Sequence, residues 1–171
     1  MDISILSETS IKIKGKTASF AIDPRNIKGK VEVDAVIVCD NDVLATDRIE
    51  SSRLTIQGPG EYEIGGVKIS GVKSQNHSLY YLSLDNMVVM VGKASDLKGK
   101  ESIRDADIVV IHADSVVDTS LLATLNPKTA VFYGEFAKAN GTALGKEVTP
   151  VGKYIITRDK LPAELEAVLL Q

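Results

Sequence analysis

The chain has 171 residues, with 20 Lys and Arg residues against 23 Asp and Glu residues, so its formal net charge at pH 7 is −3. This balance gives no general attraction to nucleic acid or to an anionic membrane. The sequence starts without an apolar stretch of signal-peptide length, and it has no run of about 20 apolar residues that could span a membrane. Cys39 is the only cysteine, which excludes an internal disulfide and suits a reducing compartment. We therefore expect a soluble cytoplasmic protein that forms one domain over residues 1–171.

Short strands dominate the predicted secondary structure. Their residues either alternate between apolar and polar or form continuous apolar runs, as in strands that are covered on both faces. Gly65-Gly66 and Asp85-Asn86 are two-residue turns of the kind that joins neighbouring strands. The predicted strands are Ile3–Leu6, Ser10–Ile13, Thr17–Ile22, Ala35–Val38, Glu61–Ile64, Val67–Ser70, Leu79–Leu84, Met87–Val91, Asp107–His112, Thr129–Tyr133 and, as the last of the chain, Tyr154–Thr157. Arg53–Gln57 begins the corner that contains the Gly65-Gly66 hairpin.

Helices are predicted in few places. Asp118–Leu125 has leucines at helical spacing and is stopped by Asn126-Pro127. Pro162–Leu170 has an early proline, and Leu161, Leu165, Val168 and Leu169 form an apolar stripe along it. Strand-rich halves with helices between and after them favour two sheets packed face to face with helices outside. The other predictions are two weaker helical segments and two loops, which are Asp42–Ile49, Asp96–Arg104, Pro24–Lys30 and Glu135–Lys146.

The segment Ile56–Val72, IQGPGEYEIGGVKISGV, carries a family resemblance. It resembles, nearly letter for letter, a segment of small bacterial metallo-β-lactamase-fold proteins of the ascorbate-6-phosphate lactonase-like branch. Asp23-Pro24 and Pro127-Lys128 match further scaffold motifs of that family, so the resemblance covers roughly Met1 to Gly134. It implies an α/β fold, namely a metallo-β-lactamase-like αββα sandwich that is β-rich with few short helices. It also implies descent from zinc or manganese hydrolases.

The metal-binding motif of that family is degenerate in this chain. The family places an H-x-H-x-D-H run directly after a buried strand, and here Asp40 and Asp42 stand at the first two histidine positions. Glu8 stands in the segment that aligns with the family's L-G-H-S motif. Lys93 replaces the metal-bridging aspartate, and Gly134 stands where the last histidine belongs. The resemblance therefore implies that the scaffold is kept and the metal site is lost.

Two interpretations of Asp40 and Asp42 stay open. Carboxylates are hard ligands that could weakly hold Mg²⁺, Mn²⁺ or Ca²⁺. We favour plain loop carboxylates, because the ammonium group of Lys93 would repel a cation and could itself replace part of the missing metal charge. His77 and His112 have no further histidine or cysteine at ligand spacing, so we expect neither zinc nor any other cofactor.

These observations predict a non-catalytic binding, scaffolding or oligomer-forming protein. Its degenerate cleft would contain Glu8, Asp40, Asp42 and Lys93, with no catalytic residue and no metal. The alternative is a metal-dependent hydrolase of the lactonase or phosphodiesterase type with an atypical carboxylate site. As partners we expect a second copy of the chain or an unknown protein, and no nucleic acid. The surfaces considered for a homodimer are Ile3–Ile13, Leu79–Leu84 and the stripe formed by Leu161, Leu165 and Leu169.

Overall fold

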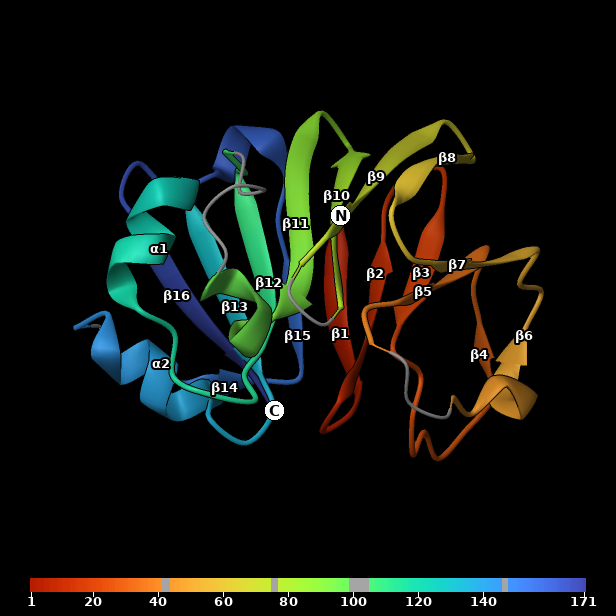
Figure 1. The fold of residues 1–171 in the computed structure, drawn as a ribbon, viewed down its shortest axis with the longest axis horizontal. Coiled ribbons are helices and arrows are strands. Elements are labelled where there is room, and N and C mark those ends of the chain that lie inside the picture. Colours follow the sequence, from red (N-terminus) through yellow and green to blue (C-terminus); the bar gives the residue numbers. More distant parts are fainter. Residues whose placement is uncertain (41–43, 75–76, 99–104, 146–147) are drawn as a thin grey trace.

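The computed structural model describes residues 1–40, 44–74, 77–98, 105–145 and 148–171. Within these residues the chain forms two large sheets packed face to face (Figure 1). The first sheet has six strands in the order β15-β1-β2-β3-β5-β7, and the second has eight in the order β14-β16-β13-β12-β11-β10-β9-β8. A small third sheet pairs β4 with β6.

The six-stranded sheet contains β1 (Asp2–Ser7), β2 (Ser10–Lys14), β3 (Ser19–Ile22), β5 (Ala35–Val38), β7 (Leu54–Gln57) and β15 (Lys153–Ile155). The eight-stranded sheet contains β8 (Gly60–Ile64), β9 (Val67–Lys73), β10 (Ser78–Leu84), β11 (Met87–Lys93), β12 (Ile108–His112), β13 (Thr129–Tyr133), β14 (Pro150–Val151) and β16 (Glu166–Leu170). The remaining elements are β4 (Val31–Glu32), β6 (Ile49–Glu50), the helices α1 (Thr119–Leu125) and α2 (Ala137–Ala143), and the 3₁₀ turns η1 (Thr46–Arg48), η2 (Ala94–Lys98) and η4 (Arg158–Lys160).

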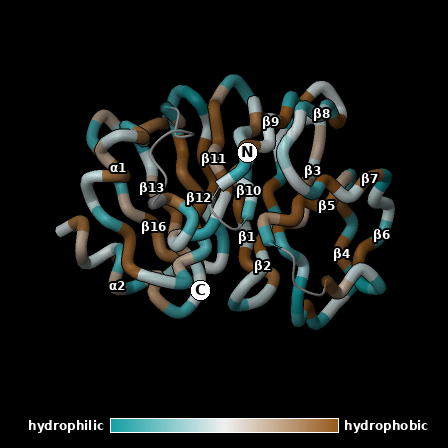
Figure 2. Tube along the Cα trace, viewed as in Figure 1, coloured by the Kyte–Doolittle hydropathy of each residue, from teal (hydrophilic) through white to brown (hydrophobic). Residues whose placement is uncertain are grey.

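The main core lies between the two large sheets. Alternate residues of each strand point into it, such as Ile11 and Ile13 of β2 and Val89 and Val91 of β11, and all four are fully buried. Figure 2 shows the hydrophobic residues concentrated along these strands, with hydrophilic residues at many of the turns. Alternation in the sequence was therefore a reliable guide to which face of each strand is buried.

A second core lies between the eight-stranded sheet and the two α-helices. The opposite faces of β12 and β13 contribute Ile111 and Phe132, and α1 covers them with Leu121, Leu122 and Leu125. Both faces of β12 and β13 are covered, which explains their apolar runs Ile108–Ile111 and Ala130–Tyr133. This confirms the buried strands predicted from the sequence. No helix among the described residues is long and apolar enough to cross a bilayer.

Helix α1 confirms the helix predicted over Asp118–Leu125. The carboxylate of Asp118 caps its first turn by accepting a hydrogen bond of 2.8 Å from the backbone N–H of Ser120. Asn126 ends it in the left-handed conformation, with φ of 45°.

The helix predicted over Pro162–Leu170 is wrong, because this segment ends in the strand β16. β16 runs parallel to β13, with Val168 opposite Val131. Val168 and Leu170 face the main core, while Leu169 faces the second core. The apolar stripe that suggested a helix is thus divided between the two faces of a strand. Tyr154–Thr157 is consequently not the last strand, and its counterpart β15 is a short edge strand.

The segment Glu135–Lys146, predicted as a loop, contains the helix α2. Tertiary contacts explain this difference, since the buried amide of Asn140 donates hydrogen bonds to the carbonyls of Ser115 and Phe136 and accepts one from the backbone N–H of Val117. Of the two weaker helical predictions, the structure shows only the turns η1 and η2, while residues 41–43 and 99–104 lie outside the described residues.

The glycine-rich segment joins the two sheets at one end of the sandwich. Gly65 and Gly66 both have positive φ, of 57° and 79°, and form the predicted turn between β8 and β9. Gly71 lies where a Cβ would come within 2.7 Å of the carbonyl oxygen of Gly58 and 2.9 Å of the Tyr80 ring. Glycine at this position therefore allows β9 to pack closely against the end of β7.

Hydrogen bonds of the Tyr80 hydroxyl stabilise this packing, and a substitution at Tyr80 tests their contribution. Its buried hydroxyl donates to the carbonyl of Val38 (2.9 Å) and accepts from the N–H of Gly58 (2.8 Å). Tyr80→Phe should lower the free energy of unfolding by about 1–3 kcal/mol, because the buried carbonyl of Val38 and the partly buried N–H of Gly58 lose their partner. Urea unfolding measures this, with Tyr62→Phe as the matched control because its hydroxyl makes only contacts of 3.4 to 3.5 Å. Equal effects of the two substitutions would contradict the role of Tyr80.

Candidate functional site

Charged side chains gather where several strands end at the same edge of the sandwich. The strands β3 and β5 are parallel neighbours, and so are β11, β12 and β13, so each group ends on one side of its sheet. The contributing residues, which we call the charged cluster, are Asp23 and Arg25 after β3, Asp40 after β5, Lys93 at the end of β11, His112 at the end of β12 and Asp114 just after it.

Asp40 is the centre of the charged cluster. Its carboxylate is almost fully buried and binds two cations, one at each oxygen. The Lys93 Nζ lies 2.7 Å from Oδ2, and the Arg25 guanidinium pairs with Oδ1. The Lys93 Nζ also lies 3.9 Å from a carboxylate oxygen of Asp114. The predicted meeting of Lys93 with Asp40 is therefore present, and Arg25 is a second cation that sequence reasoning missed.

The loop that carries Arg25 is positioned by serines of the β1–β2 hairpin. The backbone N–H of Arg25 donates to the Ser10 hydroxyl at 2.7 Å, and the Arg25 carbonyl accepts from the Ser7 hydroxyl at 2.6 Å. These bonds fix the backbone while the side chain reaches Asp40. The only sequence signal for Arg25 was its place directly after Asp23-Pro24, a motif at the end of a strand.

Asp23 is buried next to the ion pairs of Asp40. One of its oxygens accepts the backbone N–H of Cys39 at 2.8 Å and lies 3.7 Å from the Arg25 guanidinium. Burial raises the pKa of Asp23 from 3.8 to about 6, although the Cys39 N–H and the charges of Arg25 and Lys93 act in the opposite direction. Burial also raises the pKa of the Cys39 thiol, and the charge of Asp23 adds to this effect, which disfavours a reactive thiolate.

His112 is the neutral member of the charged cluster. Burial lowers its pKa to about 4, and the nearby charge of Lys93 contributes to the shift. The ring stacks at a tilt on Tyr133, with centroids 5.2 Å apart. A Cβ at Gly134 would lie 2.8 Å from His112 Cδ2, and Gly134 has φ of 96°. A histidine at position 134 would therefore be strained and would collide with His112.

The second histidine belongs to a different hydrogen-bonded pair. His77 Nδ1 lies 2.7 Å from an oxygen of the buried Asp96, and the hydroxyl of Ser74 donates to the Asp96 carbonyl. This pair joins the β9–β10 connection to η2. Among the described residues no group of three or more His, Cys, Asp or Glu side chains could hold a metal ion.

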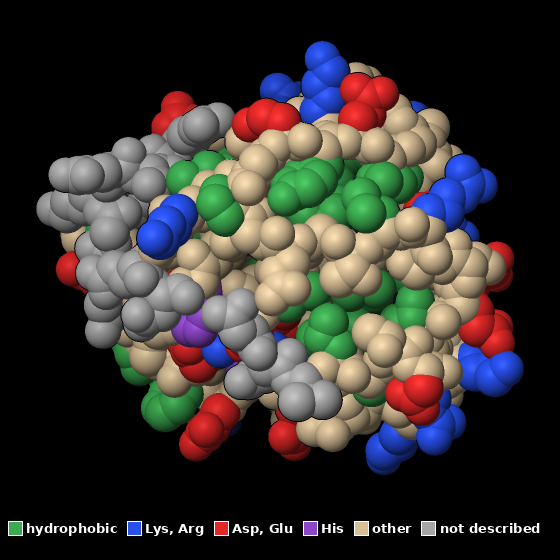
Figure 3. Space-filling view, turned by 45° about the vertical axis from the view of Figure 1, so that its right-hand side comes forward, with side chains coloured by type: hydrophobic (Ala, Val, Ile, Leu, Met, Phe, Trp, Pro, Cys, Tyr) green, Lys and Arg blue, Asp and Glu red, His purple; other side chains and the backbone are tan. Residues whose placement is uncertain are grey.

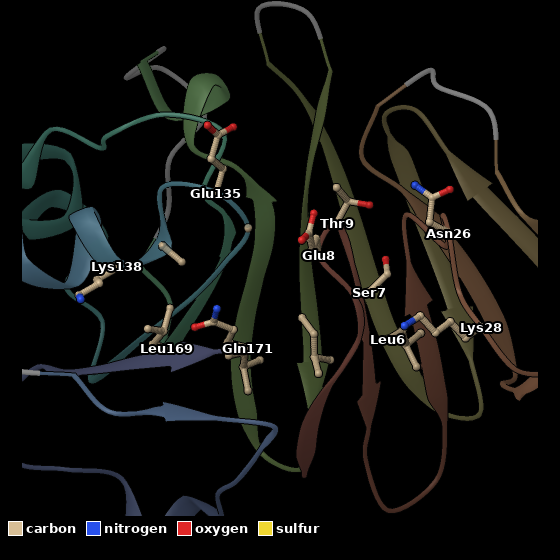
Figure 4. A pocket seen from close by; sticks show the side chains of 14 residues that line it. Leu6, Ser7, Glu8, Thr9, Asn26, Lys28, Glu135, Lys138, Leu169 and Gln171 are labelled. Carbon is tan, nitrogen blue, oxygen red and sulfur yellow. The ribbon is translucent and has the colours of Figure 1, made fainter.

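A cleft of about 910 Å³ opens beside the charged cluster. Two of its lining residues adjoin the cluster. Ser7 donates a hydrogen bond to the carbonyl of Arg25, and Gly134 lies next to the His112 ring. Figure 4 shows Glu8 and Thr9 near its centre, with Asn26 and Lys28 on one side and Glu135 and Lys138 on the other. Its apolar lining comes from Ile5, Leu6, Ala137, Leu169 and Leu170.

The four site residues predicted from the sequence have different positions. Lys93 and Asp40 form an ion pair, Glu8 lines the adjacent cleft, and Asp42 lies outside the described residues. The structure adds Arg25, Asp23 and Asp114 to the site. Asp23 belongs to the Asp23-Pro24 scaffold motif and Arg25 follows it, whereas Asp114 stands in no motif. Only the fold brings these three side chains together.

Comparison with protein-family models and with curated proteins finds no match. Solved structures do match. A metallo-β-lactamase superfamily protein of Thermotoga maritima, provisionally described as a Zn-dependent hydrolase, aligns with a TM-score of 0.74 at 14% identity over 99% of this chain and 97% of its own. The chain has the metallo-β-lactamase fold. This confirms the predicted fold class, and an identity this low establishes the fold alone.

Two further neighbours have the same architecture. A protein of Parabacteroides distasonis, provisionally described as a metal-dependent hydrolase, aligns with a TM-score of 0.61 at 14% identity, covering 99% of this chain and 93% of its own. An isothiocyanate hydrolase from Delia radicum gut bacteria aligns with a TM-score of 0.60 at 11% identity, covering 91% of this chain and 99% of its own.

In this chain both described α-helices lie on the eight-stranded sheet. The outer face of the other sheet is approached by β6 and η1, which form a shallow hollow with Val36.

The described residues do not fit a hydrolytic metal centre. Metal ligands must offer lone pairs to the ion, and the Asp40 carboxylate already accepts hydrogen bonds from two cations. A divalent ion beside it would be repelled by Lys93 and Arg25. The close approach of Gly134 to His112 leaves no space for a ligand at position 134.

The ion pair of Lys93 with Asp40 gives a stability prediction. Lys93→Met should lower the free energy of unfolding by about 3–5 kcal/mol, because a buried carboxylate loses one of its two counter-charges. Lys153→Met is the control, because its side chain is half exposed and its pair with Asp2 should contribute only about 0–1 kcal/mol. Urea unfolding measures these differences. The double variant Lys93→Met with Asp40→Asn should regain part of the lost stability, because the unpaired carboxylate is removed. An unchanged free energy of unfolding in Lys93→Met would show that the pair does not stabilise the fold.

The raised pKa of Asp23 predicts a pH dependence. The folded protein binds the Asp23 proton more tightly than the unfolded chain, so the stability contributed by this proton is lost as the pH rises from 3.8 to about 6. Asp23→Asn removes this titration. The variant should therefore gain stability relative to the wild type over that pH range, by up to about 3 kcal/mol, and the difference should stay constant at higher pH. Unfolding measured at several pH values checks this, and a difference independent of pH would contradict it.

Proposed function

We propose that the chain is a non-catalytic binding protein in which an ion-pair cluster occupies the place of a hydrolytic metal centre. The single observation that carries this proposal is the pairing of both oxygens of buried Asp40 with Arg25 and Lys93. In hydrolases that use metals, the metal supplies the positive charge that activates water and polarises the substrate. Here the positive charge belongs to side chains that are already neutralised by a carboxylate.

The charged cluster lacks the components of other hydrolytic mechanisms. The Cys39 thiol is buried with a raised pKa, which disfavours the thiolate needed for attack. Lys93 and Arg25 each hold Asp40, so neither serves as an isolated charge for a developing oxyanion. The cluster therefore supports the fold of the strand ends rather than a reaction.

The cleft beside the cluster is the part of the molecule that fits a ligand. Its rim carries two carboxylates, Glu8 and Glu135, and two ammonium groups, Lys28 and Lys138, over an apolar lining. The mixed signs disfavour a polyanion such as nucleic acid. They favour a small ligand that has an apolar part and hydrogen-bonding groups, and such ligands usually bind in clefts of this composition.

The alternative function is a metal-dependent hydrolase of the lactonase or phosphodiesterase type. It is supported by the descriptions of the structural neighbours from Thermotoga maritima and Parabacteroides distasonis and by the resemblance of Ile56–Val72 to the lactonase-like branch. It requires Asp40 to release both cations before a metal could bind, and this requirement makes it the second candidate.

Elemental analysis tests the proposal. Protein purified without chelator and then dialysed against Zn²⁺ or Mn²⁺ should retain far less than one ion per chain, because Asp40 is held by Arg25 and Lys93. Hydrolysis of lactone and phosphodiester substrates should be no faster than without protein, with or without added metal. The matched variant Lys93→Asp exchanges the repelling ammonium for a carboxylate, and it should retain more metal than the wild type.

Stoichiometric metal in the wild type would contradict the proposal, especially if Asp40→Ala abolished it. Chelator-sensitive hydrolysis would support the alternative function instead. Thermal stabilisation by members of a small-molecule library, lost in Glu8→Gln or Lys138→Gln, would locate binding in the cleft. Glu61→Gln, far from the cleft on β8, is the control and should leave such binding unchanged.

A further inference from the structure

The cleft beside the charged cluster lies between the two large sheets. Ile5, in β1, lines it from the six-stranded sheet, while Leu169 and Leu170, in β16, line it from the eight-stranded sheet. Leu170 belongs to the main core and Ile5 packs against that core, whereas Leu169 belongs to the second core. The floor of the cleft is therefore apolar and continuous with both cores, so it suits the apolar part of a ligand.

Charged side chains surround this floor, two of each sign. These rim charges are Glu8, Glu135, Lys28 and Lys138. All four are exposed, and among the described residues none of their side chains takes part in a hydrogen bond or an ion pair. Exposed side chains of opposite charge do pair elsewhere on the surface, as Lys30 does with Glu50. The rim charges are therefore available to a ligand of matching charge.

Neutral polar side chains complete the rim of the cleft. Thr9, Asn26 and Gln171 also make no side-chain hydrogen bond among the residues that the structure describes. One hydroxyl and two amide groups offer both donors and acceptors. The backbone of a peptide needs partners of both kinds, whereas an alkyl chain needs none. The neutral part of the rim thus favours a ligand that contains amide groups.

The rim charges are distributed over both walls of the cleft. Figure 4 shows Lys28 and Asn26 on one wall, Glu8 near the centre and Glu135 on the opposite wall. A ligand that spans the cleft would turn an ammonium group toward the two glutamates and a carboxylate toward the ammonium group of Lys28. A ligand with charge of one sign only would lack one of these interactions and would be repelled at the other end. The arrangement therefore favours a zwitterion whose two charges are well separated.

The size of the cleft exceeds what a single amino acid needs. Its volume of about 910 Å³ lies near the upper end of the range of about 300–1,000 Å³ in which drug-sized ligands bind. A peptide of a few residues has this size, and its free ends carry one ammonium group and one carboxylate.

The face of the molecule with β7 and β8 also carries apolar side chains, but in a different arrangement. Figure 3 brings this face forward, and hydrophobic side chains gather in its middle while charged side chains lie mostly toward its margin. The cleft instead places charges of both signs around an apolar floor. It is therefore better suited than that face to a small ligand that is both apolar and charged.

We propose that the cleft binds short peptides that have apolar side chains and free amino and carboxyl termini. This inference rests on the non-catalytic binding role proposed above and names the class of ligand. The apolar side chains would lie on Ile5, Leu169 and Leu170. The amino terminus would interact with Glu8 and the carboxyl terminus with Lys28, through charge-assisted hydrogen bonds, which are the stronger kind. The amide groups between the two ends would pair with the neutral polar side chains of the rim.

Isothermal titration calorimetry with trileucine and its blocked forms tests the proposal. Trileucine should bind the wild type, and acetylation of its amino terminus or amidation of its carboxyl terminus should each weaken binding by about tenfold, because one charged end is lost. The amide-free chain of the same backbone length, ω-aminocaprylic acid, should bind more weakly than trileucine. Equal affinity for the free and both blocked forms would overturn the proposal, and so would ω-aminocaprylic acid that binds as tightly as trileucine.

Substitutions assign each end of the peptide to a rim charge. Glu8→Gln should weaken binding of trileucine by about tenfold but should leave the affinity for acetyl-trileucine unchanged, because that ligand has no ammonium group. Lys28→Gln should act in the same way on trileucine and trileucine amide. Both residues are exposed, so circular dichroism of the variants should match the wild type. Glu61→Gln, on β8, is the control and should bind every ligand as the wild type does. An equal loss for free and blocked ligands would contradict this assignment.

The outcomes separate this inference from the proposed function. No binding of trileucine up to millimolar concentration, by a protein that also retains no metal and hydrolyses neither lactones nor phosphodiesters, would overturn the peptide inference alone. Cleavage of trileucine, detected by mass spectrometry, would contradict the non-catalytic role. Trileucine that is recovered intact, together with the losses of affinity described above, would support both proposals.

Discussion

A carboxylate buried at the end of a strand must be neutralised, and in this protein that requirement falls on Asp40. Arg25 and Lys93 reach it from the ends of two other strands, one in each sheet. Because removal of either cation leaves buried charge uncompensated, the three loops are constrained relative to one another. The hydroxyls of Ser7 and Ser10 extend the constraint to the β1–β2 hairpin. The geometry of this edge of the sandwich therefore depends on one ion-pair cluster.

In the function that we propose, the ion-pair cluster takes the place of a metal centre in a metallo-β-lactamase fold. A bound cation can hold several strand-end loops together and also perform chemistry. An ammonium and a guanidinium can meet the first requirement only, because their charges are bound to fixed side chains and their protons are engaged by carboxylates. Burial lowers the pKa of His112, and the charge of the nearby Lys93 adds to this shift. The adjacent cleft has a mixed polar and apolar lining.

The glycine-rich corner has a similar supporting role at the same end of β5. Tyr80 bridges Val38 and Gly58, and the missing side chain of Gly71 allows that bridge to form. The end of β5 is thereby tied to the eight-stranded sheet just before Asp40. The same corner ends the six-stranded sheet at β7.

The sequence by itself determined most strands of the two large sheets and their buried faces, because alternating residues such as Ile11 and Ile13 can be buried together only in an extended chain. It also determined the Gly65-Gly66 turn, since few residues other than glycine accept positive φ. Only the tertiary structure decided that Glu166–Leu170 is a strand. Its short apolar run fits the spacing of a helix as well as that of a strand, and pairing with the parallel neighbour β13 selects the strand. Likewise, Arg25 lies 15 residues before Asp40, and no local pattern pairs them. Their interaction exists because parallel strands end at one edge of the sheet and leave a buried carboxylate that only a nearby cation can neutralise.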